Sequence, residues 1–424
     1  MLDPRMIRDD VAQLRDAMAR RDKRELYAPL IDEGEALDRA RRQAIQQVEE
    51  KKAARNRLSQ DVGKRKKAGE DAADLQASAR ALGEEIAALE ADLAVTQARL
   101  DEILLLIPNV TLPDVPAGDE TNNVVVRTWG EPRATSGVIP HWEIGEQLGL
   151  FDLPRGAKIA GSGFIVYRGL GARMVRSLMN MMLDLHTGTF DYEETWVPVV
   201  VNRASMIGTT QLPKFEDDMY ALKDEDMFLI PTAEVPVTNL YRDEILSAEE
   251  LPKAMCAYSP CFRREAGSAG KDTRGLLRVH EFDKVELVRY CAPEDGEAQL
   301  LLLLSHAEAV LRLLGLPYRV VLLAAGDTGF GSAKTYDLEV FAPGVDKWLE
   351  VSSCSLFTDF QARRANIRFR PAVGEKPRFI YTLNGSGLAF PRVFAAILEH
   401  YQTADGGVDI PPPLRRWLGV DRLG

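Results

Sequence analysis

Long hydrophobic runs are missing from this chain of 424 residues. Its longest apolar segments, such as 320–325 and 393–398, are far shorter than the roughly 18 to 20 residues that a membrane-spanning helix needs. The amino terminus mixes Arg and Asp with apolar residues and lacks the hydrophobic centre of a secretory signal. We therefore expect a cytoplasmic protein with no membrane partner. The 46% hydrophobic content is enough for one large domain with an appendage, or for two ordinary domains.

Close pairs of cysteine or histidine, which usually mark a zinc site, are also missing. The chain has four cysteines and five histidines, and all of them are scattered. We expect buried, free thiols in a reducing compartment at Cys256, Cys261, Cys291 and Cys354. A phosphate-binding P-loop is absent too, because the glycine-rich stretch 267–272 lacks the required spacing and the Ser or Thr. A bound nucleotide would therefore be held by side chains.

The net charge of −11 argues against a surface that binds DNA or other nucleic acid over its whole extent, because phosphate contacts need clustered Lys and Arg. The charges are nevertheless segregated. Residues 39–67 contain eleven Lys or Arg against three Asp or Glu, a balance of +8, and residues 70–102 contain two against nine, a balance of −7. The basic segment ends in four consecutive cations at 64–67.

These two segments have the apolar spacing of paired helices. Residues 75–107 carry a heptad pattern, with alternating steps of four and three, at Leu75, Ala79, Leu82, Ile86, Leu89, Leu93, Thr96, Leu100, Ile103 and Ile107. A weaker version lies along 37–62, and Gly63 and Gly69 bound a predicted turn, so we predict an antiparallel helical hairpin. The opposite charges of the two helices allow two interpretations. Either they pair the helices across the hairpin, or the cationic tip contacts the phosphate backbone of a nucleic acid.

Charged residues also recur inside an apolar, strand-like segment at 278–288. Alternate side chains of a strand share a face, so one face carries Arg278, His280, Phe282, Lys284 and Glu286 while the other is mostly core. Cations, an aromatic ring and a carboxylate suit a flat, negatively charged, amine-bearing ligand. A nucleotide beside an amino acid fits that description.

Two further predicted strands carry polar residues. The strand 229–237 contains Thr232 and Glu234, and the strand 349–355 contains Glu350 and Ser353. Glu350 and Ser353 differ in parity, so a bulge or bend is required if they are to share a face.

Two segments with predicted helices complete the pattern. A Met-rich helix at 174–187, which is typical of a core, precedes a predicted strand at 195–201. Pro198 interrupts this strand, which suits the edge of a sheet and not its centre. The segment 382–392 runs into a helix that continues to about residue 401, and Arg392 lies near the amino end of that helix. The helix dipole disfavours a cation there, and a nearby anion would offset this.

The run from Cys261 to Glu286 resembles the second signature motif of class II aminoacyl-tRNA synthetases. Its continuous stretch RREAGSAGKDTRGLLR at 263–278 resembles the seryl-tRNA synthetase version, 174–201 resembles the first motif, and 382–392 resembles the third, although Phe390-Pro391 stands where many members carry Val-Gly. The resemblance implies an α+β fold in which helices flank an antiparallel sheet, with an N-terminal coiled-coil arm.

The resemblance also implies an activity: L-serine is activated with ATP and Mg²⁺ to seryl-adenylate and transferred to tRNA(Ser), and also to tRNA(Sec). The implied ATP-binding residues are Arg263, Glu265, Arg278, Val279, Phe282, Glu350, Val351, Ser352, Ser353 and Arg392. Of these, Arg263 and Arg392 are the implied catalytic residues, and Glu350 and Ser353 face the metal. The implied serine-binding residues are Thr232, Ala233, Glu234, Arg263, Glu286, Asn384 and Ser386.

By the same resemblance, residues 1–108 form a tRNA-binding arm, 109–117 a proline-containing linker, and 118–424 the catalytic domain of a homodimer. The arm would hold the long variable arm of the tRNA, which is recognised by shape and backbone. The implied tRNA-binding residues are Lys51, Lys52, Arg55, Lys64, Arg65, Lys66 and Lys67.

Two alternatives remain open at this point. A ligase that loads an amino acid onto a carrier protein would share the ATP chemistry but would not need the long arm. A catalytically inactive interaction protein built on the coiled coil would not need the charged residues of the site.

Overall fold

The computed structural model describes residues 1–265 and 274–424, so most of the predicted motif loop between Arg263 and Arg278 lies outside the described residues. The chain forms two compact units, Met1–Pro108 and Asn109–Gly424. Within the described ranges, no helix is both long and apolar enough to cross a bilayer. All four cysteines are buried and free, as expected.

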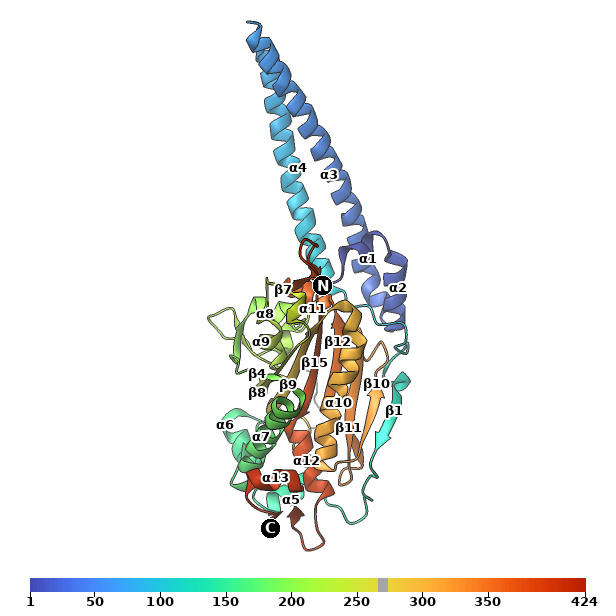
Figure 1. Ribbon diagram of the computed structural model, residues 1–424, viewed down its shortest axis with the longest axis vertical. Coiled ribbons are helices and arrows are strands. Elements are labelled where there is room, and N and C mark those ends of the chain that lie inside the picture. Colours follow the sequence, from blue (N-terminus) through green and yellow to red (C-terminus); the bar gives the residue numbers. More distant parts are fainter. Residues whose placement is uncertain (266–273) are drawn as a thin grey trace. The chain divides into compact units, whose positions relative to one another are not determined.

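The first unit is helical. Its two long helices, α3 (Arg24–Lys67) and α4 (Ala73–Leu106), run side by side, and α1 (Pro4–Arg8) and α2 (Val11–Arg20) pack at the start of α3 (Figure 1). The predicted hairpin is therefore confirmed. The turn is shorter than predicted, because α3 continues through Gly63 and the four cations to Lys67.

Burial along the heptad seam of α4 is uneven. Ile86, Leu100 and Ile103 are buried, whereas the other α4 seam positions are partly exposed. A two-helix hairpin without further layers can cover each seam residue from one side only. Shielding is most complete at the carboxyl end of α4, and Ile103 also contacts the site of Gly34 on α3.

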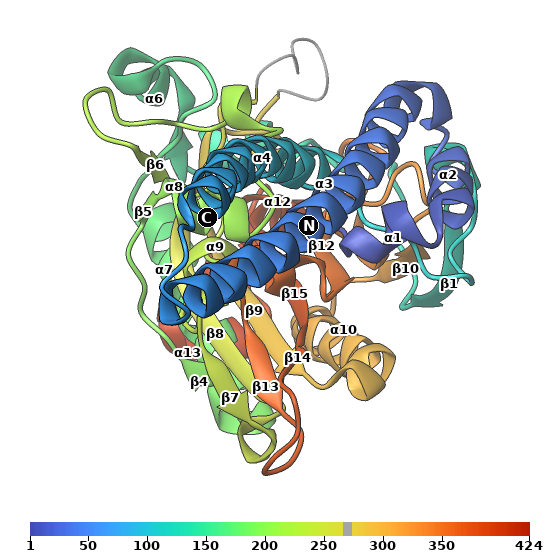
Figure 2. The same cartoon turned by 90° about the horizontal axis from the view of Figure 1, so that it is seen from above.

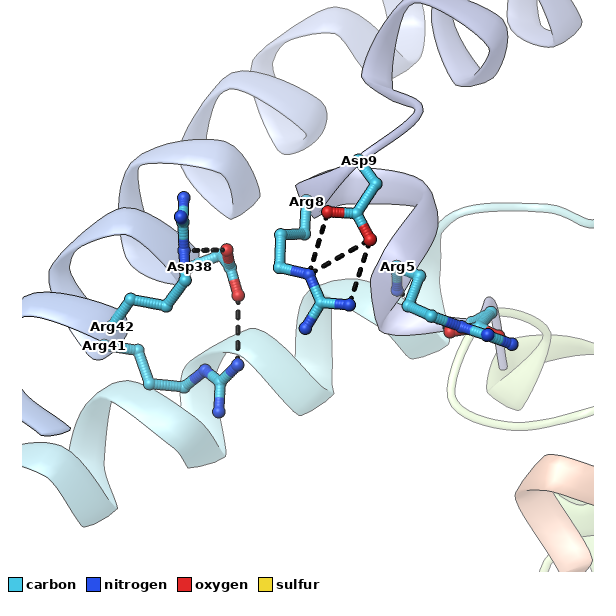
Figure 3. A network of polar contacts seen from close by, with 7 residues as sticks. Arg5, Arg8, Asp9, Asp38, Arg41 and Arg42 are labelled. Carbon is cyan, nitrogen blue, oxygen red and sulfur yellow. Dashed lines mark hydrogen bonds and ion pairs between the residues drawn. The ribbon is translucent and has the colours of Figure 1, made fainter.

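A buried acid organises the arginines near the start of α3. Asp38 is only 2% exposed, and its carboxylate accepts hydrogen bonds from Arg41 Nη2 at 3.1 Å and Arg42 Nε at 2.9 Å. Arg8 is paired with Asp9 close by (Figure 3). A buried carboxylate needs such charge-assisted partners, so these contacts explain how Asp38 is tolerated inside the helical unit.

The second unit is built on an eight-stranded sheet with strand order β1-β10-β11-β12-β15-β9-β8-β4. Every neighbouring pair is antiparallel except β4 and β8. In that order the strands are β1 (Val124–Trp129), β10 (Tyr318–Leu322), β11 (Lys334–Ala342), β12 (Lys347–Thr358), β15 (Tyr381–Ala389), β9 (Glu281–Cys291), β8 (Lys253–Phe262) and β4 (Glu193–Glu194).

Three apolar helices cover most of this sheet. α10 (Gly296–Leu314) lies along β12 and β15, α7 (Leu170–Phe190) packs on β8 and β9, and α12 (Phe390–His400) packs on β11 and β12 (Figure 1). Their buried side chains join those of the central strands in one hydrophobic core. The predicted α+β architecture is confirmed.

The remaining elements are short. A small sheet joins β7 (Ile245–Ser247), β13 (Arg368–Arg370) and β14 (Arg378–Phe379), and in it β7 lies beside β13 although the two are distant in sequence (Figure 2). The other strands are β2 (Phe151–Asp152), β3 (Val166–Tyr167), β5 (Val200–Asn202), β6 (Met227–Leu229), β16 (Val408–Asp409) and β17 (Arg422–Leu423). The other α-helices are α5 (His141–Gln147), α6 (Leu153–Ala160), α8 (Arg203–Gly208), α9 (Glu234–Thr238), α11 (Phe360–Ala365) and α13 (Pro412–Leu418). The 3₁₀ helices are η1 (Glu120–Asn122), η2 (Glu216–Asp218), η3 (Ala248–Glu250) and η4 (Pro293–Asp295).

The predicted strand at 229–237 is wrong. β6 ends at Leu229 and α9 begins at Glu234. Pro231 cannot donate to a strand ladder, and the Thr232 hydroxyl accepts a hydrogen bond from the Glu234 backbone N–H at 3.2 Å, which favours a turn.

Two other strand predictions are wrong at their starts. β9 begins at Glu281, so Arg278 and His280 precede it, and the His280 ring contacts the backbone oxygen of Arg263 and stacks on Phe164. In the segment 195–201 only the end is a strand, because β5 starts at Val200, after Pro198.

Residues 109–117, the predicted linker, belong to the second unit and are bonded to its other segments. The Asn109 side-chain amide donates to the backbone oxygens of Gly331 and Phe357, at 2.9 Å in each case. The backbone N–H of Leu112 donates to Ala333, and that of Ala325 donates to Pro116. The proline-containing segment is thus held by hydrogen bonds along its length.

A buried pair anchors the loop that follows residue 273. The Glu399 carboxylate of α12 accepts from His141 Nδ1 at 2.7 Å and from the backbone N–H groups of His141 and Gly344, while His141 Nε2 accepts from the backbone N–H of Leu276 at 3.1 Å. We expect Glu399→Ala to lower the free energy of unfolding by about 3 kcal/mol, because it leaves buried donors unpaired. Urea unfolding measures this change. The exposed Glu375→Ala is the control, with an expected change within about 0.5 kcal/mol.

Candidate active site

Two adjoining cavities open beside the central strands of the second unit. The first has a volume of about 280 Å³ and the second about 240 Å³. Four residues line both cavities: Arg263, Lys284, Glu350 and Ser386. Two ligands bound in these cavities would therefore meet at a boundary that carries both cations and a carboxylate.

The first cavity gathers three arginines that are distant in sequence. Arg263 follows the end of β8, Arg278 precedes β9, and Arg392 lies in the first turn of α12. Because β8 and β9 are neighbours and α12 continues from β15, the next strand, the fold brings all three to one wall. Glu265, Val279, Phe282 and Val351 also line this cavity.

Each arginine is held by a different contact. Arg392 donates to the backbone oxygens of Leu277 at 3.1 Å and Glu350 at 2.6 Å, and Arg278 forms an ion pair with Glu265. The Arg263 guanidinium lies 5.1 Å from the centre of the Phe282 ring. These contacts fix the guanidinium groups before any ligand binds, as suits a polyanion-binding wall.

The helix that carries Arg392 starts where its sequence favours a start. α12 begins at Phe390, and Pro391 occupies its first turn, where a missing N–H leaves no intrahelical bond unmade. The Phe390-Pro391 pair is therefore compatible with the placement of Arg392 at the cavity.

A bulge in β12 brings Glu350 and Ser353 toward the same side, as predicted. Ser352 is paired with Leu338 and Glu350 with Glu339, so Val351 is an extra residue in the ladder. Both Glu350 and Ser353 line the second cavity. Ser352 is buried behind the wall, where its hydroxyl donates to the backbone oxygen of Ser386 at 2.6 Å.

The second cavity contains most of the predicted serine-binding residues. Its lining includes Thr232, Glu234, Arg263, Asn384 and Ser386. Ala233 is fully buried in a neighbouring apolar cluster and supports the turn that carries Thr232 and Glu234.

Glu286 lies on β9 behind this lining, directly opposite Ser386 on β15. Its Oε2 accepts from the Thr232 hydroxyl at 2.9 Å and forms an ion pair with the buried Lys284. Its Oε1 is buried and has no hydrogen-bond partner among the described residues. A buried acceptor left open beside a polar cavity favours a ligand that brings a hydroxyl or an ammonium donor.

Glu234 is a buried acid whose protonation is finely balanced. Burial, and next the nearby charge of Glu286, raises the pKa of Glu234 to about 7. Gln361, Lys284 and Asn384 act in the opposite direction. A cationic group in the second cavity would favour the ionised carboxylate further.

Three residues of this region were not among the predicted site residues: Lys284, Asp337 and Gln361. The sequence pattern already places Lys284 on the same strand face as Phe282 and Glu286, but neither the pattern nor the resemblance assigns it a role. Asp337 faces Ser353 across the ladder of β11 and β12, and burial, with the charge of Glu350, raises its pKa. The roles of Asp337 and Gln361 depend on strand register and on the placement of a helix, which no local pattern reveals.

No group of three or more His, Cys, Asp or Glu side chains in the described ranges converges in a metal-binding cluster. Mg²⁺ does not require one, because it commonly uses one or two carboxylates together with phosphate oxygens. Glu350 and Ser353 supply oxygen ligands at the cavity, and the buried Asp337 Oδ1 near them has no hydrogen-bond partner among the described residues. This donor set fits Mg²⁺ bound with a triphosphate.

The predicted tRNA-binding residues lie on α3, and several of them pair across the hairpin. Lys51 is paired with Glu85, Lys52 Nζ lies 2.9 Å from Glu90 Oε1, and Arg65 Nη1 lies 3.1 Å from Asp74 Oδ1. Lys64 is paired with Asp61 on its own helix. No carboxylate of the described residues lies within ion-pair distance of the other three, which are Arg55, Lys66 and Lys67.

Comparison with known proteins agrees with this geometry. Residues 214–401 match the family "tRNA synthetase class II core domain (G, H, P, S and T)", and residues 1–111 match "Seryl-tRNA synthetase N-terminal domain". The catalytic unit is thus that of a class II aminoacyl-tRNA synthetase.

Similarity over the full length identifies the family within this class. A serine–tRNA ligase of Gemmatimonas aurantiaca is 64% identical over 420 residues, which cover 99% of each chain, and one of Pelotomaculum thermopropionicum is 52% identical over 427 residues, which cover 100% of each. A crystal structure of seryl-tRNA synthetase from Pyrococcus horikoshii complexed with ATP superposes with a TM-score of 0.96 at 36% identity, covering 100% of this chain and 99% of that one. The chain belongs to the seryl-tRNA synthetase family.

Because the pKa of Glu234 is raised, we expect that replacing this residue by an uncharged one stabilises the protein by an amount that depends on pH. A carboxyl whose folded pKa lies above its unfolded value destabilises the protein progressively as pH rises through the folded value. With a folded pKa of about 7, Glu234→Gln should stabilise the protein by about 2.5 kcal/mol more at pH 8 than at pH 5. Thermal unfolding of both proteins at the two pH values tests this. An equal difference at both would contradict the raised pKa.

Proposed function

We propose that this chain activates L-serine with ATP and transfers the resulting seryl group to the 3′ end of tRNA(Ser), and also to tRNA(Sec). The observation that carries the proposal is the convergence of Arg263, Arg278 and Arg392 on one cavity that adjoins a second, acidic one. A carrier-protein ligase would share this convergence, but it would not need the arm, which matches the seryl N-terminal domain.

In the proposed activation step, ATP occupies the first cavity. Phe282 stacks on the adenine and Glu265 accepts from its amine, while Arg263 binds the α-phosphate and Arg278 and Arg392 bind the outer phosphates. The serine carboxylate then attacks the α-phosphorus and pyrophosphate leaves. The side chains act by positioning and by stabilising charge that develops on the phosphate oxygens.

The proposed ATP site is completed by Val279 and Val351, which form part of its wall, and by Ser352, which lies behind that wall. Glu350 and Ser353 are the proposed holders of Mg²⁺, which neutralises charge on the phosphates when bound. The bulge at Val351 supports this assignment, because it is what brings both side chains to the second cavity.

Serine occupies the second cavity in this proposal. Its ammonium group binds Glu234 and Thr232, and its hydroxyl reaches Ser386 and the open Oε1 of Glu286. Asn384 completes the polar wall. A site that binds the hydroxyl through buried polar atoms can reject alanine, because those atoms would otherwise stay unpaired.

In the transfer step, the terminal ribose hydroxyl of the tRNA attacks the carbonyl carbon of seryl-adenylate, and AMP leaves. The exposed Lys66 and Lys67 at the end of α3 carry most of the proposed contact with the tRNA backbone, and Arg55 and the paired Lys51, Lys52, Lys64 and Arg65 add to it. We further propose that the protein acts as a cytoplasmic homodimer through α7 and the strands after it, where Trp196 is 75% exposed.

Serine-dependent pyrophosphate exchange, run with each of the twenty amino acids, tests the activation step. We expect exchange with serine and a rate at least about 100-fold lower with alanine. Glu286→Ala should lower kcat/KM for serine by about 100-fold and reduce the preference over alanine, because the open acceptor is lost. Glu286→Gln keeps the shape and gives the cost of the charge alone. Glu281→Ala, at the exposed start of the same strand, is the control; unchanged exchange in Glu286→Ala would refute the assignment.

A charge reversal tests the role of the arm. The double variant Lys66→Glu/Lys67→Glu should raise the KM for tRNA(Ser) by about tenfold and reduce the salt dependence of tRNA binding, because two phosphate contacts are lost. Its pyrophosphate exchange should equal that of the unaltered protein. Lys376→Glu, at an exposed position on the catalytic unit, is the control for a charge reversal outside the arm. If the double variant charged tRNA(Ser) as well as the unaltered protein does, the proposed role of these cations would be wrong.

A further inference from the structure

One buried amide beneath the second cavity has two strong partners. Gln361 of α11 is 1% exposed, and its Nε2 donates to Glu234 Oε1 at 2.6 Å. Its Oε1 accepts from the hydroxyl of Thr382, on β15, at 2.7 Å. Glu234 is 6% and Thr382 is 0% exposed, so the three side chains form a line of hydrogen bonds that is shielded from water.

We propose that Gln361 is a positioning residue of the amino-acid site: its amide, held between Thr382 and Glu234, aims the Glu234 carboxylate at the ammonium group of the bound amino acid. This inference rests on the function proposed above and deepens it. Gln361 does not line either cavity as described, so it acts through Glu234 and does not touch the substrate.

The chemistry of the line decides which way the amide faces. An ionised carboxylate only accepts hydrogen bonds, so the NH₂ group of Gln361 must face Glu234 whenever Glu234 is charged. The amide oxygen then accepts from the Thr382 hydroxyl, which holds the far end of the amide in place. Ionised Glu234 is thereby held at a fixed position in the wall of the second cavity.

The amide also affects the pKa of Glu234, together with the other polar groups around this carboxyl. From β9, Glu286 opposes the ionised form and Lys284 favours it; from β15, Asn384 favours it through a hydrogen bond. In the turn before α9 the Thr232 hydroxyl accepts from the backbone N–H of Glu234, and Arg263 lines the same cavity. Among these groups, Gln361 lowers the pKa of Glu234 the most. Its loss should raise the pKa of Glu234 further above its present value of about 7.

This arrangement links serine affinity to pH. Only the ionised carboxylate can bind an ammonium group, so the apparent KM for serine should fall as pH rises and level off above the pKa of Glu234. With that pKa at about 7, the KM at pH 6 should be about tenfold higher than at pH 8. Loss of the Gln361 donor should move the midpoint of this curve to higher pH.

The experiment is pyrophosphate exchange with the full-length chain from pH 6 to pH 9, comparing Gln361→Met with the unaltered protein. We expect the KM for serine at pH 7 to rise by about tenfold, the midpoint of its pH curve to move up by about one unit, and part of the affinity to return at pH 9. The KM for ATP should stay within about twofold.

Two further variants separate positioning from general damage. Thr382→Val removes the hydroxyl that holds the amide oxygen, and it should move the same midpoint in the same direction by a smaller amount. This variant decides the question if Gln361→Met does not fold. Gln402→Met is the matched control, because among the described residues the side chain of this buried glutamine bonds only to backbone groups of Ile139 and Leu398. It should leave the pH curve unchanged.

The outcomes are distinguishable. If the unaltered protein exchanges pyrophosphate with serine but Gln361→Met and Thr382→Val keep its serine KM and its pH midpoint, the inference about Gln361 is overturned and the proposed function stands. If the unaltered protein shows no serine-dependent exchange, the proposed function fails and the inference fails with it.

Discussion

The structure depends on one electrostatic constraint: charged side chains that project from the centre of an antiparallel sheet must be given partners before a ligand arrives. Lys284 and Glu286 occupy β9 with core residues around them, and they pair with one another. Arg278 pairs with Glu265, and Arg392 with backbone oxygens. Isolated buried charges would be strongly destabilising, so this mutual compensation permits a polar site inside the fold.

The same constraint separates two kinds of cavity wall. The arginines share one cavity, where Arg278 and Arg392 are held by acceptors in its lining and Arg263 lies over the Phe282 ring. Glu234 lines the second cavity, and Glu286 lies behind that lining with its Oε1 unpaired among the described residues. Lys284 stands between the two and limits the repulsion between the carboxylates. In the proposed function, this separation of charge directs a polyanion to the first cavity and an amine-bearing amino acid to the second.

Sequence reasoning succeeded where the pattern was local or periodic. The heptads predicted the hairpin, and the parity of Glu350 and Ser353 predicted a bulge or bend, which the structure places at Val351. It failed where a short polar side chain competed with a strand ladder, as at Thr232, whose hydroxyl closes a turn onto Glu234. It also overextended the strand that begins at Glu281, because alternation alone does not reveal that His280 turns toward the backbone of Arg263.

The sequence by itself determined the family, the helical arm and the identity of the charged residues, because motifs and periodicity are properties of neighbouring positions. Only the tertiary structure decided that three arginines meet at one cavity, that Glu286 keeps one oxygen open, and that Gln361 reaches Glu234 from 127 positions away. The physical reason is that these relations are set by strand order, register and helix packing, which join segments far apart in the chain.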